Sequence, residues 1–127
     1  MKPYLVILYL IICVVLGASA DALYFDGNKL LSHSLGSLET GLLLMGALVF
    51  KLERKHWLAF IVSYVTWRIV GFDITYNLVA GLPWNHIGTT SLWDKFFSKY
   101  AIDGWIWVKF IALILAVSTP IKYITCK

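Results

Sequence analysis

Hydrophobic residues fall into four long runs, separated by short polar segments, at residues 3–20, 31–51, 57–78 and 105–121. A helix needs about 20 mostly apolar residues to cross the ~30 Å hydrocarbon core of a bilayer. The pattern therefore predicts four transmembrane helices. The first run ends in Ala18-Ser19-Ala20, which has the form of a signal-peptidase site, but we expect it to remain as an uncleaved span.

The second run is the least regular of the four. Its strictly apolar part, Gly41 to Phe50, is only half as long as a span requires. The helix must therefore extend back through residues 31–40 and carry five polar side chains into the membrane: His33, Ser34, Ser37, Glu39 and Thr40.

A shorter amphipathic helix is predicted at 92–100, between the third and fourth runs. Trp93, Phe96, Phe97 and Tyr100 share one face of it, and charged residues occupy the other. Such a segment is typical of a helix lying in the membrane interface. The expected fold is all-α: a polytopic membrane protein with one domain at 1–127, four spans and one interfacial helix.

Composition agrees with this pattern. Of the 127 residues, 60% are hydrophobic and 14% are charged, and the mean hydropathy is +0.77. Soluble domains are about 45–50% apolar and about 25% charged, so a soluble protein is excluded. The net charge of +4 comes from basic residues scattered at the ends of the runs. We expect the lipid bilayer, and no nucleic acid, as the partner.

Orientation follows from the basic residues, which concentrate on the cytoplasmic side of membrane proteins. With the amino terminus inside, six lie on the inner side: Lys2, Lys51, Arg54, Lys55, Lys122 and Lys127. Three lie on the outer side: Lys29, Lys95 and Lys99. We therefore expect both termini in the cytoplasm and a location in the plasma or inner membrane.

Four charged residues, Glu39, Arg68, Asp73 and Lys109, lie within or beside the spans. Glu39 is twelve residues from Lys51, and Arg68 is eleven from Trp57. At ~1.5 Å per residue, both lie ~16–18 Å from the same short connection. We therefore predict a Glu39–Arg68 pair, with Asp73 as the rival partner for Arg68 and Lys109 as the rival partner for Glu39.

This neutral cluster has two interpretations that the sequence leaves open. It organises the packing of a small bundle, or it lines a polar cavity that binds or conducts a small ion. The function we put first is a non-catalytic membrane subunit or self-associating assembly, as a homo-oligomer or in a larger complex. We predict no cofactor for it, and a divalent metal only under the alternative that follows.

A metal-dependent membrane hydrolase acting on a lipid or headgroup is the first alternative. Carboxylates and imidazoles can hold a divalent metal that activates water. The candidate ligands on the outer side are Asp21, Asp26, His33, Asp73, His86 and Asp94, with Asn77 beside them. Their spacing matches no metal-binding motif, and ordinary surface acids and interfacial histidines explain them more simply.

Two further expectations concern the segment before the interfacial helix and the size of the chain. Gly88, Thr89, Thr90 and Ser91 precede a helix amino terminus, where backbone amides can hold a phosphate or lipid headgroup. An ordinary capped loop is the alternative. Four spans in so short a chain also allow a pore-forming or lysis protein.

Overall fold

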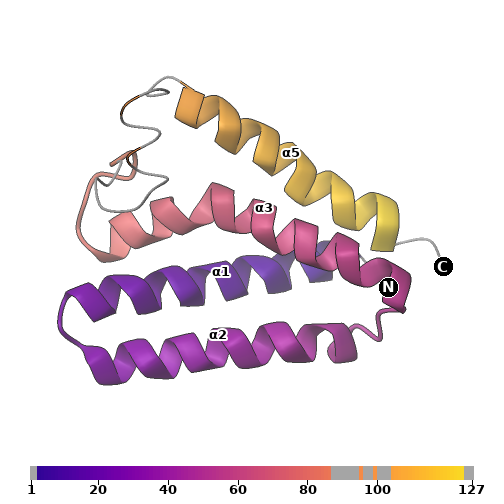
Figure 1. The fold of residues 1–127 in the computed structure, drawn as a ribbon, viewed down its shortest axis with the longest axis horizontal. Helices are drawn as coiled ribbons and strands as arrows, with labels where there is room; N and C mark the ends of the chain where they lie inside the picture. The colour runs from indigo at the N-terminus through magenta and orange to yellow at the C-terminus, as the bar shows by residue number, and fades with distance from the viewer. Residues whose placement is uncertain (1–2, 87–94, 96–98, 100–103, 125–127) are drawn as a thin grey trace.

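The computed structural model describes residues 3–86, 95, 99 and 104–124, and within these ranges four long helices follow one another in alternating directions. They are α1 (Pro3–Phe25), α2 (Lys29–Val49), α3 (Arg54–Val79) and α5 (Gly104–Ile124) (Figure 1). Both chain termini and the α2–α3 connection lie at one end of the bundle, which we call the terminal end (Figure 1). The α1–α2 turn lies at the opposite end, which we call the turn end.

The central helix of the bundle is α1, because it contacts α2, α3 and α5. The helix α2 packs chiefly against α1, whereas α3 also contacts α5. Close approach at the terminal end depends on Gly46 of α2. A Cβ atom there would lie 2.7 Å from Cζ of Phe60 and 3.0 Å from Cε1 of Tyr9. The core beside it is built on Val6, Leu10, Ala59 and Phe60.

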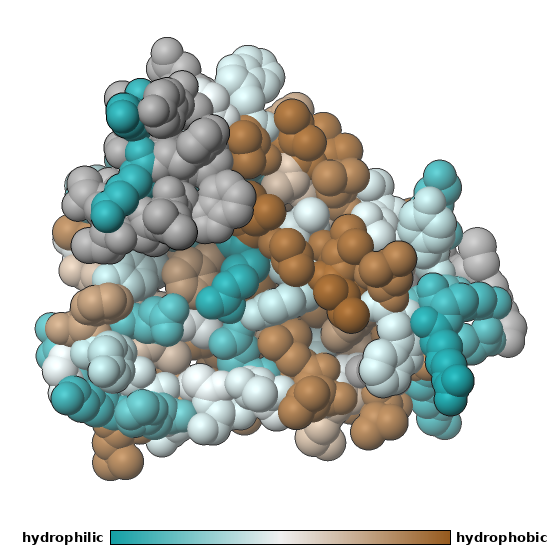
Figure 2. Space-filling model, viewed as in Figure 1, coloured by the Kyte–Doolittle hydropathy of each residue, from teal (hydrophilic) through white to brown (hydrophobic). Residues whose placement is uncertain are grey.

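Among the described residues, three helical segments are long and apolar enough to cross a membrane: Pro3–Phe25, Arg54–Val79 and Gly104–Tyr123. These segments are typical of a membrane protein. Hydrophobic residues cover much of the middle of the visible surface, and hydrophilic residues gather at both ends (Figure 2). The remaining helix, α2, has 21 residues but does not reach the same hydropathy.

Glycines with positive φ end two of the helices. Gly27 follows α1 with φ 86°, and Gly81 follows α3 with φ 72°. In each case the next residue donates its N–H to a carbonyl five positions back: Asn28 to Leu23 at 3.0 Å and Leu82 to Asn77 at 2.7 Å. This closure satisfies carbonyl groups that a helix end leaves unpaired.

The helices extend beyond the predicted spans. Residues 21–25, predicted to belong to a polar connection, continue α1. The helix α3 begins at Arg54, three residues before the predicted start at residue 57. The connection was predicted too long because Asp21 is polar, yet nothing between Asp21 and Gly27 breaks a helix. The predicted interfacial helix at 92–100 lies outside the described residues, apart from Lys95 and Lys99, which are helical and exposed.

A buried hydrogen bond joins α3 to α5 where α5 contains Pro120. Proline has no N–H, so the carbonyl of Ala116, four residues earlier, loses its helical donor. The Ser63 hydroxyl of α3, fully buried, donates to that carbonyl oxygen at 3.1 Å. A side chain of one helix thus replaces the bond that proline removes from the other.

Candidate functional site

Glu39, Tyr64 and Arg68 form a hydrogen-bonded cluster that connects α2 to α3. Arg68 Nη1 lies 3.1 Å from Glu39 Oε1, and the Tyr64 hydroxyl donates to the same oxygen at 2.6 Å. Arg68 Nη1 also donates to the Tyr64 hydroxyl oxygen at 2.8 Å. The guanidinium carbon lies 4.4 Å from the centre of the Phe72 ring. Arg68 is therefore held by a carboxylate, a hydroxyl and an aromatic face.

The cluster crosses over α1 at Gly17. A Cβ atom at position 17 would lie 2.4 Å from both carboxylate oxygens of Glu39. Only a residue without a side chain leaves room for the carboxylate here. Gly17 therefore lets Glu39 reach over α1 to Tyr64 and Arg68.

A second ion pair connects α3 to α5. Lys109 Nζ lies 3.0 Å from Asp73 Oδ2, and it also donates to the backbone oxygen of Ile69 at 2.6 Å. The ammonium nitrogen is 4.7 Å from the centre of the Trp105 ring. This lysine is thus surrounded by acceptors from α3 and by one aromatic ring from its own helix.

The structure brings the four predicted cluster residues together as two separate neutral pairs, Glu39 with Arg68 and Asp73 with Lys109. Neither rival pairing occurs among the ion pairs of the described residues. Each pair has one protected and one exposed member. The Glu39 and Lys109 side chains are 12% and 11% exposed, whereas Arg68 and Asp73 are 40% and 43% exposed.

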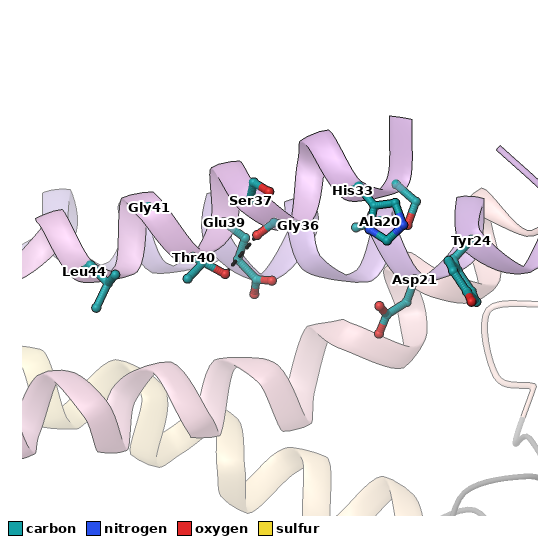
Figure 3. A pocket seen from close by; sticks show the side chains of 11 residues that line it. Ala20, Asp21, Tyr24, His33, Gly36, Ser37, Glu39, Thr40, Gly41 and Leu44 are labelled. Atoms are coloured by element: carbon teal, nitrogen blue, oxygen red, sulfur yellow. Dashed lines mark hydrogen bonds between the residues drawn. The ribbon is translucent and has the colours of Figure 1, made fainter. Parts of the chain in front are cut away.

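A groove of about 780 Å³ runs along the α1–α2 pair beside Glu39. In Figure 3 the carboxylates of Asp21 and Glu39 project in the same direction from their two helices. The lining residues are Ala20, Asp21 and Tyr24 from α1, and Ser32, His33, Gly36, Ser37, Glu39, Thr40, Gly41 and Leu44 from α2. Carboxylate, imidazole and hydroxyl groups therefore lie on its walls beside apolar surface.

The predicted metal ligands are dispersed in the part of the chain that the structure describes. Asp21 and His33 line the groove, Asp26 is exposed in the α1–α2 turn, and Asp73 pairs with Lys109. His86 is exposed, and its backbone oxygen accepts a hydrogen bond from the Asn77 side chain at 2.8 Å. Within those ranges, no three histidine, cysteine or acidic residues form a group that could hold a metal ion.

Other predicted site residues cannot be placed in this geometry. Asp94, from the metal set, and Gly88, Thr89, Thr90 and Ser91, from the anion set, lie outside the described residues. The candidate site therefore consists of the two ion pairs and the groove.

Tyr64 and Gly17 were not among the site residues predicted from the sequence. A signal for Tyr64 was present, because residues four apart share a helix face and Tyr64 precedes Arg68 by four. Gly17 stands directly before the small residues of the possible cleavage site, and its role depends on a helix that lies elsewhere in the sequence. No periodicity in α1 indicates which helix will face it.

No protein-family model, curated protein or solved structure matches this chain.

Proposed function

We propose that the chain is an integral membrane protein in which α2 is a fourth span. At ~1.5 Å per residue, its 21 residues extend about 31 Å, close to the thickness of the hydrocarbon core. Glu39 lowers the hydropathy of α2, but Arg68 compensates its charge. The antiparallel arrangement with α1 and α3 supports this topology (Figure 1).

The proposed orientation places the terminal end in the cytoplasm of the plasma or inner membrane. Four basic residues of the described chain, Lys51, Arg54, Lys55 and Lys122, belong to the helix ends and connection at that end. Cytoplasmic segments of membrane proteins are enriched in such residues. Both termini would then be cytoplasmic.

The function that we propose is that of a non-catalytic, self-associating membrane subunit whose ion pairs organise its helices. The exposure of Arg68 and Asp73, 40% and 43%, carries this proposal. A charge facing hydrocarbon is costly even when its partner is close. Contact with a second copy would cover these charges.

The mass of the assembly tests this proposal. The protein would be extracted with its lipids, without detergent, and its mass measured by native mass spectrometry. We expect a multiple of the 14.4 kDa chain. Arg68→Gln should shift the distribution towards the single chain. A matched control is Lys55→Gln, which changes an ion pair beside the α2–α3 connection, at the end of the bundle. Both of its side chains are well exposed, 64% and 42%, but they lie outside the proposed hydrocarbon core, so the mass should not change.

Two results would contradict the proposal. A single chain in the unmodified protein would show that no second copy covers the exposed charges. A complex with one copy of this chain and a different protein would keep the subunit role but replace self-association.

A further inference from the structure

The groove beside Glu39 begins at the turn end and continues far along α2. His33 lies four residues from the start of α2 and Gly41 lies twelve from it, and both line the groove. At ~1.5 Å per residue, Gly41 is about 18 Å along the helix from Lys29. In the four-span arrangement, that depth is near the middle of the hydrocarbon core.

The walls of the groove carry polar groups that water can satisfy and a lipid chain cannot. Three ionisable side chains (Asp21, His33 and Glu39) and the hydroxyls of Tyr24, Ser32, Ser37 and Thr40 line it. Among the described lining residues, Leu44 is the one long aliphatic side chain. A lipid chain in the groove would lie against groups that need hydrogen-bond partners.

Apolar packing replaces the polar lining beyond the inner end of the groove. Beyond Leu44, α2 reaches Gly46, which packs tightly against Phe60 and Tyr9. The apolar core around Val6 and Leu10 lies in the same region. The polar lining therefore continues to the turn end but not to the terminal end.

We propose that this groove is a water-filled vestibule, entered from the turn end, through which small hydrophilic cations, including protons, reach Glu39. The proposal rests on the proposed function in one respect, that α2 spans the membrane. Asp21 makes the entrance acidic, which favours cations over anions. Both hydrogen bonds that the Glu39 side chain accepts from described residues end at Oε1, and neither uses Oε2.

Cysteine accessibility tests the vestibule. In the full chain carrying Cys13→Ala and Cys126→Ser, a single cysteine is introduced at Thr40 or at Leu38. The two positions are two residues apart on α2 and both are exposed, but Thr40 lines the groove and Leu38 does not. The probe is a membrane-impermeant trimethylammonium methanethiosulfonate, added to either side of sealed vesicles.

We expect Thr40→Cys to react at least about tenfold faster than Leu38→Cys, because the cationic probe cannot enter hydrocarbon. The reaction should occur from the side that also modifies Asn28→Cys. A sulfonate probe of similar size should react more slowly with Thr40→Cys, and adding Asp21→Asn should reduce this preference for the cation.

Several results would overturn the vestibule. A smaller difference between Thr40→Cys and Leu38→Cys would show that lipid or another protein covers the groove, and disulfide formation between copies at Thr40→Cys would identify a second copy there. Reaction from the side that modifies Arg54→Cys would show that the groove opens at the wrong end. Equal rates for the two probes would remove the cation preference.

These failures differ from a failure of the four-span topology. If α2 does not span, Asn28→Cys and Arg54→Cys will be modified from the same side. If the topology holds and only the vestibule is wrong, these two positions will react from opposite sides while Thr40→Cys remains slow.

Discussion

At the scale of single residues, the carbonyl oxygen of Ala116 provides a test of the contact between α3 and α5. Ser63→Ala removes its side-chain donor, and Pro120 leaves it without a helical one. We expect the free energy of unfolding to fall by about 1 kcal/mol. Unfolding in mixed micelles, followed by circular dichroism, would measure the change.

The control is a thermodynamic cycle with Pro120→Ala. In that background residue 120 has an N–H for Ala116, so Ser63→Ala should cost clearly less. Ser34→Ala should have little effect in either background, because the Ser34 hydroxyl bonds to Leu30 within its own helix. An equal cost of Ser63→Ala in both backgrounds would contradict this account.

Gly17 is the second residue whose role can be tested directly. In Gly17→Ala the new methyl group would overlap the Glu39 carboxylate, which must move away from Arg68 and Tyr64. We expect a loss of about 1–3 kcal/mol in the free energy of unfolding. Gly41→Ala is the matched control, because a Cβ atom there meets nothing within 4 Å. A loss at Gly41 as large as at Gly17 would show that overlap with the Glu39 carboxylate is not the cause.

At the scale of helices, the Glu39–Arg68 pair connects α2 and α3 across α1. Arg68→Met leaves the protected Glu39 carboxylate without its counter-charge, and should destabilise the protein by about 1–3 kcal/mol. This is less than a fully buried pair would lose, because Arg68 is 40% exposed. The double variant Glu39→Gln/Arg68→Met should unfold at a higher denaturant concentration than Arg68→Met alone. The opposite order would show that the pair acts by something other than charge compensation.

The sequence predicted the helices better than it predicted their contacts. Four hydrophobic runs correspond to four helices, and counting residues from the α2–α3 connection placed Glu39 level with Arg68. The rotation of each helix about its axis could not be predicted from the sequence, because apolar residues cover most sides of α1 and α3. For that reason only the three-dimensional structure shows that the four charges form two separate pairs. It also shows that Tyr64 bonds to Glu39, and that Glu39 passes over α1 at Gly17.

At the scale of the whole molecule, the two ends of the bundle should face opposite compartments. We predict that a membrane-impermeant maleimide modifies Asn28→Cys in intact cells, and modifies Arg54→Cys only after permeabilisation. The concentration of basic residues at the terminal end is the physical reason. The reverse pattern would invert the proposed orientation, and labelling of both positions in intact cells would exclude α2 as a span.

The central place of α1 also has a consequence for how the protein is made. The ribosome produces first the helix that contacts all three others, so each later helix finds its main docking surface already present. Glu39, however, is synthesised 29 residues before Arg68. During that interval α2 carries a carboxylate without its counter-charge. We expect the insertion machinery to retain α2 until α3 emerges, and to release the two helices into the lipid together.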